Sequence, residues 1–317
     1  MSYEQLMQHA AEIERLAVKG ALEQKGFVYD PHGNPHAPTD IGEQGAQDII
    51  DMTAKQFSDV QSMFSPFASM PDPNAFGGMR DDMLAAMREL STGQTPTDPI
   101  TGLGVEANIT LDAMGGVGDA LLDWHGKAAE TFKLNFVEPF DSFTRNQFML
   151  VAILKGGIEA EQEIWKNARA NADKIAHDAI TALEHMGDCG KNDWTMLFTV
   201  GASVAAVGAT VVTGGTAIIA LTAVGAASQV VAAAAPDDPP KTQFSGETAE
   251  AVISQVREAL STLASEIRKQ EQKIASAMTS CSSYVVAHRS SFVAARPTLA
   301  GATASTVRDS QSGLGEA

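Results

Sequence analysis

The residues best suited to chemistry in this chain lie in one short loop, residues 27–40. His32 and His36 stand four residues apart there, with Asp30 and Asp40 nearby. Imidazole and carboxylate groups in such a loop could hold a metal ion. The alternative, which we favour, is a polar surface turn whose side chains satisfy one another. We therefore predict no metal site.

Catalytic spacings are missing from the rest of the sequence. It contains no P-loop, no HExxH and no CxxC pair. Gly115, Gly116 and Gly118 follow a helical pattern and not a strand, so close helix packing explains them better than a nucleotide-binding loop. We predict a protein that is not an enzyme and that uses no cofactor.

The most informative segment is residues 194–236, which hold no charged side chain. Gly214-Gly215 at its centre predicts a turn, because glycine adopts positive φ without steric cost. As a helix, each arm would reach about 28 Å, close to the bilayer hydrocarbon thickness of about 30 Å. Such a block is expected to be buried in protein or to meet lipid. We assign nine positions to this apolar hairpin: Trp194, Leu197, Val207, Val212, Gly214, Gly215, Ile218, Ile219 and Leu221.

The composition of the whole chain restricts the class of partner. Lys and Arg number 22 against 39 Asp and Glu, which gives a net charge of -17. This balance argues against nucleic acid, which requires a basic face, and against simple attraction to anionic lipid headgroups. The first twenty residues lack the basic start and apolar run of a secretory signal. Cys189 and Cys281 are the two cysteines, and we predict no bridge between them.

Outside the uncharged block the apolar patterns are helical. The expected helices cover residues 6–26, 42–64, 79–90, 105–122 and 127–186, with a linker at 92–103. Met79, Met83 and Met87 are spaced as a core stripe. Trp124-His125-Gly126 predicts a sharp turn between two helices, and Pro139 should interrupt the second of them.

The clearest periodicity follows the block, in an expected helix over 246–292. Its seam is spaced by three and four residues in alternation, which is a sustained heptad pattern with one polar position. The seam residues are Ile253, Val256, Leu260, Leu263, Ile267, Gln270, Ile274, Ala277 and Cys281. A helix this long, about 70 Å at 1.5 Å per residue, must lie along other long helices.

These patterns predict an all-α fold. We expect an elongated bundle of long antiparallel helices, with a helix–turn–helix hairpin at Trp124 and an apolar hairpin between the two longest helices. The expected regions are 1–100, helical with Pro- and Gly-rich loops; 101–193, the Trp-x-Gly hairpin; 194–236, the uncharged hairpin; 237–296, the heptad helix packing on 127–187; and 297–317, a disordered tail.

Residues 105–185 resemble the Trp-x-Gly substrates of type VII (ESX) secretion. The matching features are Trp124-His125-Gly126 at the turn, with Ala128, Ala129 and Phe132 just after it, and a long second helix. The resemblance implies a helical hairpin that dimerises or packs with a partner hairpin, in a chain that leaves actinobacterial and related cells without a cleaved signal. None of the tyrosines begins a Tyr-x-x-x-Asp/Glu export signal, so export would need a partner chain or a variant signal.

The layout of the chain also resembles the cytolysin A-like α-helical pore-forming toxins, including the tripartite enterotoxin subunits. Those proteins hide an apolar tongue against a helical stalk and release it into membranes. We therefore expect a secreted, non-enzymatic effector that interacts with or inserts into membranes through residues 194–236. Oligomerisation or lipid contact would expose these residues, and pore formation could follow oligomerisation. The alternative is an assembly protein whose apolar hairpin packs in its own core or against identical subunits.

Overall fold

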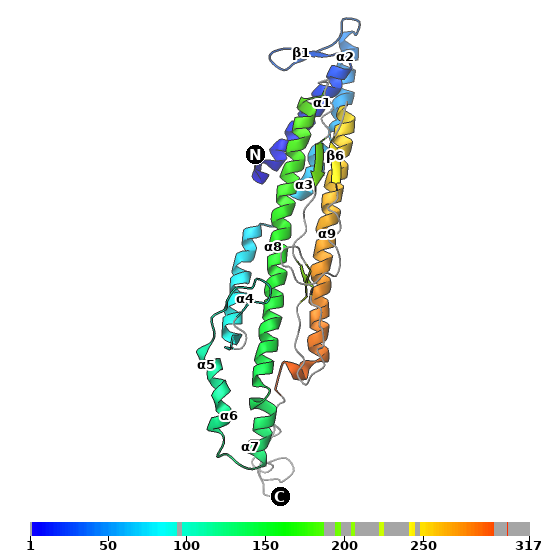
Figure 1. The fold of residues 1–317 in the computed structure, drawn as a ribbon. Helices are drawn as coiled ribbons and strands as arrows, with labels where there is room; N and C mark the ends of the chain where they lie inside the picture. The colour runs from blue at the N-terminus through cyan, green and yellow to red at the C-terminus, as the bar shows by residue number, and fades with distance from the viewer. Residues whose placement is uncertain are drawn as a thin grey trace. The chain divides into compact units, whose positions relative to one another are not determined.

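A computed structural model of the chain describes residues 2–93, 97–186, 194–197, 204–206, 222–224, 241–244 and 248–294, together with Thr303. Its main elements are helical, as predicted (Figure 1). The α-helices are α1 (Leu6–Gln24), α2 (Glu43–Phe57), α3 (Val60–Ala68), α4 (Gly77–Leu90), α5 (Ile109–Asp112), α6 (Val117–Ala120), α7 (Lys127–Phe132), α8 (Phe140–Glu184) and α9 (Ala249–Ala287).

Short elements join these helices. The single-turn helices are η1 (Tyr3–Gln5), η2 (Pro73–Phe76), η3 (Ala113–Gly116), η4 (Lys133–Val137, a π-helix) and η5 (Arg289–Ser291). The strands are β1 (Val28–Tyr29), β2 (Pro35–His36), β3 (Trp194–Leu197), β4 (Val204–Ala206), β5 (Thr222–Val224) and β6 (Lys241–Phe244). They form three antiparallel pairs, β1 with β2, β3 with β6 and β4 with β5.

The chain divides into two compact units. Unit 1 contains 1–75, 161–202 and 235–272, and unit 2 contains 76–160, 203–234 and 273–317. The division falls within α8 and α9, so each of these long helices contributes one part to each unit.

Unit 1 is a helical bundle built around α1. This helix packs on α2 and α3. It also contacts the C-terminal part of α8 and the residues just after it, and later residues of α1 contact later residues there. His9 lies 3.5 Å from Asp173, and a Cβ added to Gly20 would meet Met186. The helix α1 therefore runs parallel to this part of α8, which differs from the purely antiparallel bundle expected. Its apolar face is buried throughout; its buried residues include Leu6, Ala10, Ile13, Ala17 and Ala21.

In unit 2, α8 and α9 pack antiparallel. Ile153 of α8 shares a core cluster with Cys281, while Gly157 faces Ile274 and Met278, earlier in α9. Nearer the start of α8, the Asn146 side chain donates to the Ser291 carbonyl at 2.7 Å. As residue numbers rise along α8, the numbers of the contacting residues fall along α9 and the segment after it. This confirms the prediction of two long packed helices.

The heptad seam of α9 is buried as the sequence predicted. Eight of its nine positions are buried in the structure, and Ala277 is half-buried. Gln270, the polar position, is 7% exposed. Burial on this scale stabilises a long helix through packing, since helix propensity alone is marginal.

Three local predictions need correction. The expected helix over 42–64 is two helices, α2 and α3, separated at Ser58-Asp59. Of the methionine stripe only Met87 is fully buried, while Met79 is 49% exposed, because α4 turns a single narrow face to the core. The expected helix over 105–122 consists of α5, η3 and α6, since its three glycines give little helix propensity.

The uncharged block is extended wherever the structure describes it. Val204 pairs with Val224 and Ala206 with Thr222, a register whose midpoint in the sequence is Gly214. Trp194 pairs with Phe244 and Leu197 with Lys241. Helical arms are therefore the wrong interpretation for these residues, where β-branched Val and Thr favour strands. Within the described residues, no helix is long and apolar enough to cross a membrane.

Candidate functional site

The first candidate site is the turn at Trp124. Helix α6 ends at Ala120, and α7 begins at Lys127. Gly126 precedes α7 with φ 101° and ψ 169°, a conformation that side-chain-bearing residues avoid. The Lys133 ammonium donates to the Trp124 carbonyl at 3.3 Å and ties the turn to η4. The chain therefore reverses direction between two helical segments at this position (Figure 1).

Aromatic rings continue from the turn toward α8. The Trp124 and Phe132 centroids lie 5.6 Å apart, those of Phe132 and Phe136 5.2 Å, and those of Phe136 and Phe140 6.0 Å. These separations are typical of favourable aromatic pairs. Pro139 directly precedes α8 and interrupts the helical run, as predicted, because it has no N–H to donate.

A hollow of about 620 Å³ opens beside this turn. Its lining combines apolar and charged side chains: Trp124, His125, Gly126, Glu130, Lys133, Leu134 and Glu138. Trp124 is 43% exposed and Leu134 is 53% exposed. The turn thus presents an aromatic ring and an aliphatic side chain to solvent with two glutamates beside them.

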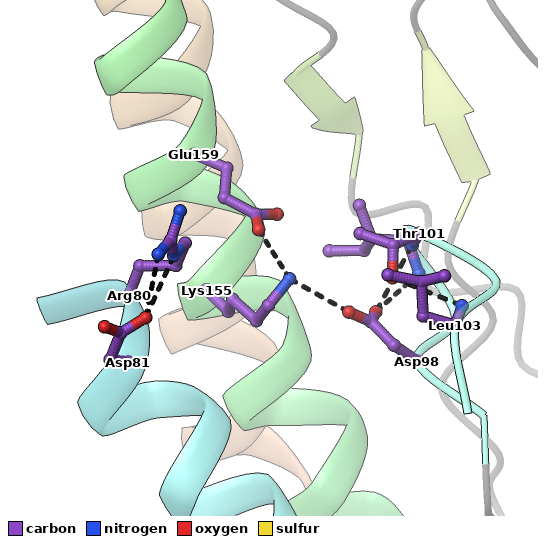
Figure 2. Close-up of polar contacts among 8 residues, drawn as sticks. Arg80, Asp81, Asp98, Thr101, Leu103, Lys155 and Glu159 are labelled. Atoms are coloured by element: carbon purple, nitrogen blue, oxygen red, sulfur yellow. Dashed lines mark hydrogen bonds and ion pairs between the residues drawn. The ribbon is translucent and has the colours of Figure 1, made fainter. Parts of the chain in front are cut away.

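The second candidate site is a buried ion pair that the sequence did not reveal. The Lys155 ammonium donates to the Asp98 carboxylate at 2.9 Å and to Glu159 at 2.7 Å. The Lys155 and Asp98 side chains are 5% and 3% exposed. Figure 2 shows Lys155 reaching from α8 between these two carboxylates.

Asp98 also folds the loop that carries it. Its carboxylate accepts from the backbone N–H of Ile100 at 2.9 Å, and its own N–H donates to the Leu103 carbonyl at 2.8 Å. Thr97 and Gly104 close the loop through an isolated β-bridge. The 92–103 segment is therefore not merely a linker, because residues 97–104 form a tight loop fixed to α8 (Figure 2).

The electrostatics of this pair are set by opposing effects. Burial of Asp98 acts to raise the pKa of its carboxyl, but hydrogen bonds from Lys155, Ile100 and Thr101 outweigh burial and hold that pKa below 3.8. Burial of Lys155 acts to lower its pKa, but hydrogen bonds to Glu159 and Asp98 raise it above 10.5. Both groups therefore stay charged at neutral pH.

Gly156 and Gly157 on α8 allow close approach on two sides of this pair. A Cβ added to Gly156 would clash with the Ile100 side chain, and one on Gly157 would lie 3.0 Å from Met278. The glycine pair therefore admits the 97–104 loop on one side and α9 on the other. The signal in the sequence was Lys155 itself, which follows the buried Phe148 and Ala152 at helical spacing.

The loop with two histidines behaves as a polar turn. Hydrogen bonds from Asn34, first from its backbone N–H and then from its side chain, lower the pKa of Asp30 to about 2. His36 Nε2 lies 3.4 Å from the same carboxylate, and the His32 N–H donates to it at 2.9 Å. Among the described side chains, no group of three or more His, Cys, Asp or Glu residues could hold a metal ion.

The predicted membrane positions fall mainly outside the described residues. Trp194 and Leu197 lie in β3. The remaining seven lie outside: Val207, Val212, Gly214, Gly215, Ile218, Ile219 and Leu221. Cys281 is buried with a free thiol, while Cys189 lies outside the described residues.

No family model matches the chain, and neither a curated protein nor a solved structure matches it.

Proposed function

We propose that this protein is a non-enzymatic helical effector that meets membranes through residues 194–236. The observation that carries the proposal is an uncharged block inserted between two long helices, α8 and α9. The β4–β5 register, centred on Gly214, supports a hairpin whose tip is the Gly-Gly turn. No charged group would have to enter lipid with it.

Transfer of this block into lipid is favourable in proportion to its apolar area. Its backbone sets the main cost, since lipid offers no hydrogen bonds to exposed N–H and C=O groups. In the described residues β4 and β5 form a two-stranded pair, which leaves the outer edge of each strand open. In lipid these arms must become helical or pair with the arms of another copy. The proposal therefore includes oligomerisation.

The ends of the block are held together in the protein. Strand β3 pairs with β6, so Trp194 lies opposite Phe244. With its two ends fixed in this way, the segment between them can leave its soluble position without separating α8 from α9. The trigger would be lipid, detergent or a partner subunit.

Export is the second part of the proposal. The hairpin at Trp124 would meet a partner helical-hairpin chain during type VII-like secretion, and that chain would supply the missing export signal. The half-exposed Trp124 ring at the turn supports this role. Co-purification of the chain with a candidate hairpin partner, compared for wild type and Trp124→Ala, tests it. Loss of the partner with unchanged helicity is the expected result.

A dye-release assay tests the membrane step. Val207→Asp with Ile219→Asp places one charge in each arm, at a cost on the order of 3 kcal/mol per site in lipid. Release from zwitterionic liposomes, triggered by detergent below its critical concentration, should fall at least tenfold. The matched control places aspartate at Val28 and Val286, which are 68% and 77% exposed. This control should release dye as the wild type does.

The competing function is assembly without a membrane step. Small residues in the block suit close packing against protein as well as lipid. If the wild type releases no dye with any trigger, while the double variant loses its oligomeric state, the assembly function replaces the membrane function. Both variants must keep wild-type helicity for either comparison.

A further inference from the structure

We propose that the hollow beside Trp124 is a docking site for a basic, partly apolar segment of another protein chain. The inference deepens the export part of the proposed function by naming the chemistry of the partner. It does not require that residues 194–236 enter a membrane. It rests on three features of the turn: its exposed apolar groups, its surplus of carboxylates and its rigidity.

Two apolar side chains belong to the hollow, and others are exposed on the segment before it. Trp124 and Leu134 line the hollow, and both are substantially exposed. Ile109 and Leu122, on the segment that leads into the turn, are 84% and 64% exposed. Exposed aromatic and aliphatic groups around a concave surface are typical of protein recognition sites.

The charge around this hollow points to a basic occupant. Residues 106–138 carry six carboxylates against two lysines. Glu130 and Glu138 belong to the lining itself, one on each side of Leu134 in the sequence. Lys133, the one lysine in the lining, donates to the Trp124 carbonyl. The field in the hollow is therefore negative, and complementary charge speeds and orients association.

The groups present fit a lysine or arginine side chain well. A guanidinium can stack on the exposed face of Trp124 in a cation–π contact and pair with a glutamate at the same time. Its aliphatic stem, or a neighbouring leucine of the partner, would cover Leu134. An anionic lipid surface fits poorly, because six carboxylates would oppose it.

The turn is held in shape before any partner arrives. Gly126 adopts the positive φ that the reversal needs, and a tilted Trp124–Phe132 pair and a stacked Phe132–Phe136 pair pack beside it. Preorganisation lowers the entropic cost of docking. The contact with Phe132 therefore helps to orient the exposed Trp124 ring for a partner.

The test measures binding of a fluorescein-labelled amphipathic peptide that carries arginines on one helical face and leucines on the other. Its twin has glutamates in place of the arginines. Anisotropy titrations use the full chain at low ionic strength. We expect the arginine peptide to bind, the glutamate twin to bind at least tenfold more weakly, and added salt to reduce binding.

Variants of the hollow separate this site from general charge attraction. Glu130→Gln with Glu138→Gln should weaken binding about fivefold to tenfold, as expected for two partly exposed ion pairs. The matched control, Glu43→Gln with Asp48→Asn on α2, removes equal charge from exposed positions and should change affinity less than twofold. Equal loss in both double variants would overturn the proposal, because binding would then follow net charge alone.

Trp124→Ala should weaken binding about tenfold through loss of the cation–π contact and apolar area. Trp124→Phe should retain part of the affinity and serves as the second variant if the alanine variant loses helicity. Binding of Trp124→Phe and Trp124→Ala at wild-type affinity would overturn the proposal, as would Trp124-dependent binding of zwitterionic vesicles without peptide binding. Val207→Asp with Ile219→Asp should bind the peptide as wild type does, so failure of the membrane step leaves this result unaffected.

Discussion

Helix α1 and the Trp124 hairpin carry similar apolar spacing, but they use it differently. Ile13 in α1 is fully buried, with α2 and α3 packed on the helix. Ile109 at the start of the hairpin is 84% exposed. The hairpin consists of short helical segments that pack mainly on one another, so much of their apolar surface has no partner among the described residues of its unit. Periodicity therefore predicts helix in both regions, whereas burial depends on the neighbours available.

Replacement of one isoleucine by alanine in each region should give the largest difference in the free energy of unfolding. Ile13→Ala should lower the free energy of unfolding by about 4 kcal/mol, because it removes packed methylene groups and leaves a cavity. Ile109→Ala should change it by less than about 0.5 kcal/mol. Urea denaturation followed by circular dichroism measures both. Similar losses would mean that the hairpin is packed as tightly as α1.

The buried ion pair gives the next largest effect. Lys155→Met should cost about 3 kcal/mol, because it leaves the Asp98 carboxylate buried without its partner. The double variant Lys155→Met with Asp98→Asn should recover much of this loss. The same denaturation experiment measures both variants. An equal loss in single and double variants would show that the pair acts only through its packing.

Alanine at Gly126, in the turn, and at Gly118, in α6, should change stability by intermediate amounts of opposite sign. Gly126→Ala should destabilise the hairpin by about 2 kcal/mol, because alanine strongly disfavours a φ of 101°. Gly118 lies in α6, and a Cβ added there would meet open space. Gly118→Ala should therefore stabilise the segment by about 0.5 kcal/mol through helix propensity. Hydrogen exchange of amides in α6 and α7 reports both changes. Tolerance of alanine at Gly126 would contradict the described turn.

The buried pair of Asp98 and Lys155 should make the free energy of unfolding depend on pH at both extremes. The lowered pKa of Asp98 means that its stabilising contribution is present above pH 3.8 and is lost as pH falls through the lower, folded-state pKa. Lys155, whose pKa is raised, contributes below pH 10.5 and loses that contribution as pH rises through its folded-state pKa. Denaturation of Lys155→Met with Asp98→Asn should therefore show a weaker dependence at both extremes than wild type. An unchanged pH profile would argue against the assigned pair.

Glu161 in unit 1 has the contrary sign and the smallest expected effect. Burial, and then the nearby Glu271 carboxylate, raise its pKa above 4.5. Its contribution is therefore favourable at low pH and is lost as pH rises through the folded-state pKa. Because Glu161 is partly exposed, solvent screening keeps this effect small. Glu161→Gln should raise the free energy of unfolding at pH 7 by roughly a few tenths of a kcal/mol and should leave it unchanged below pH 4.5. Glu163→Gln, an exposed control paired with Lys166, should not show this gain.

Much of the helical fold was predictable, because its signals are repeated many times. The seam from Ile253 to Cys281 fixes the buried face of α9, and Gly26, with φ 87°, follows the end of α1. Boundaries were less predictable where a single residue decides them. The separation of α2 from α3 at Ser58-Asp59 carries no proline or glycine signal.

The sites were harder to predict because they depend on contacts between distant segments. Asp98 and Lys155 are 57 residues apart, and nothing in the sequence around either residue indicates that the other is its ion-pair partner. The Trp124 turn was predictable from Gly126, but the hollow beside it was not, since its lining requires the coordinates of both helical segments. In the uncharged block, Val and Thr fit both a lipid-facing helix and a strand, so composition alone could not choose between them.

The central claim, that residues 194–236 enter lipid while the rest of the chain does not, has one direct measurement. Single cysteines at Val207, Ile219 and Val28, in a Cys189→Ser/Cys281→Ser background of unchanged helicity, carry an environment-sensitive NBD label. On addition of zwitterionic vesicles and trigger, labels at 207 and 219 should brighten and become open to quenchers within the acyl chains, while the label at 28 stays unchanged. Labels at 207 and 219 that remain accessible to iodide and insensitive to vesicles would contradict the account.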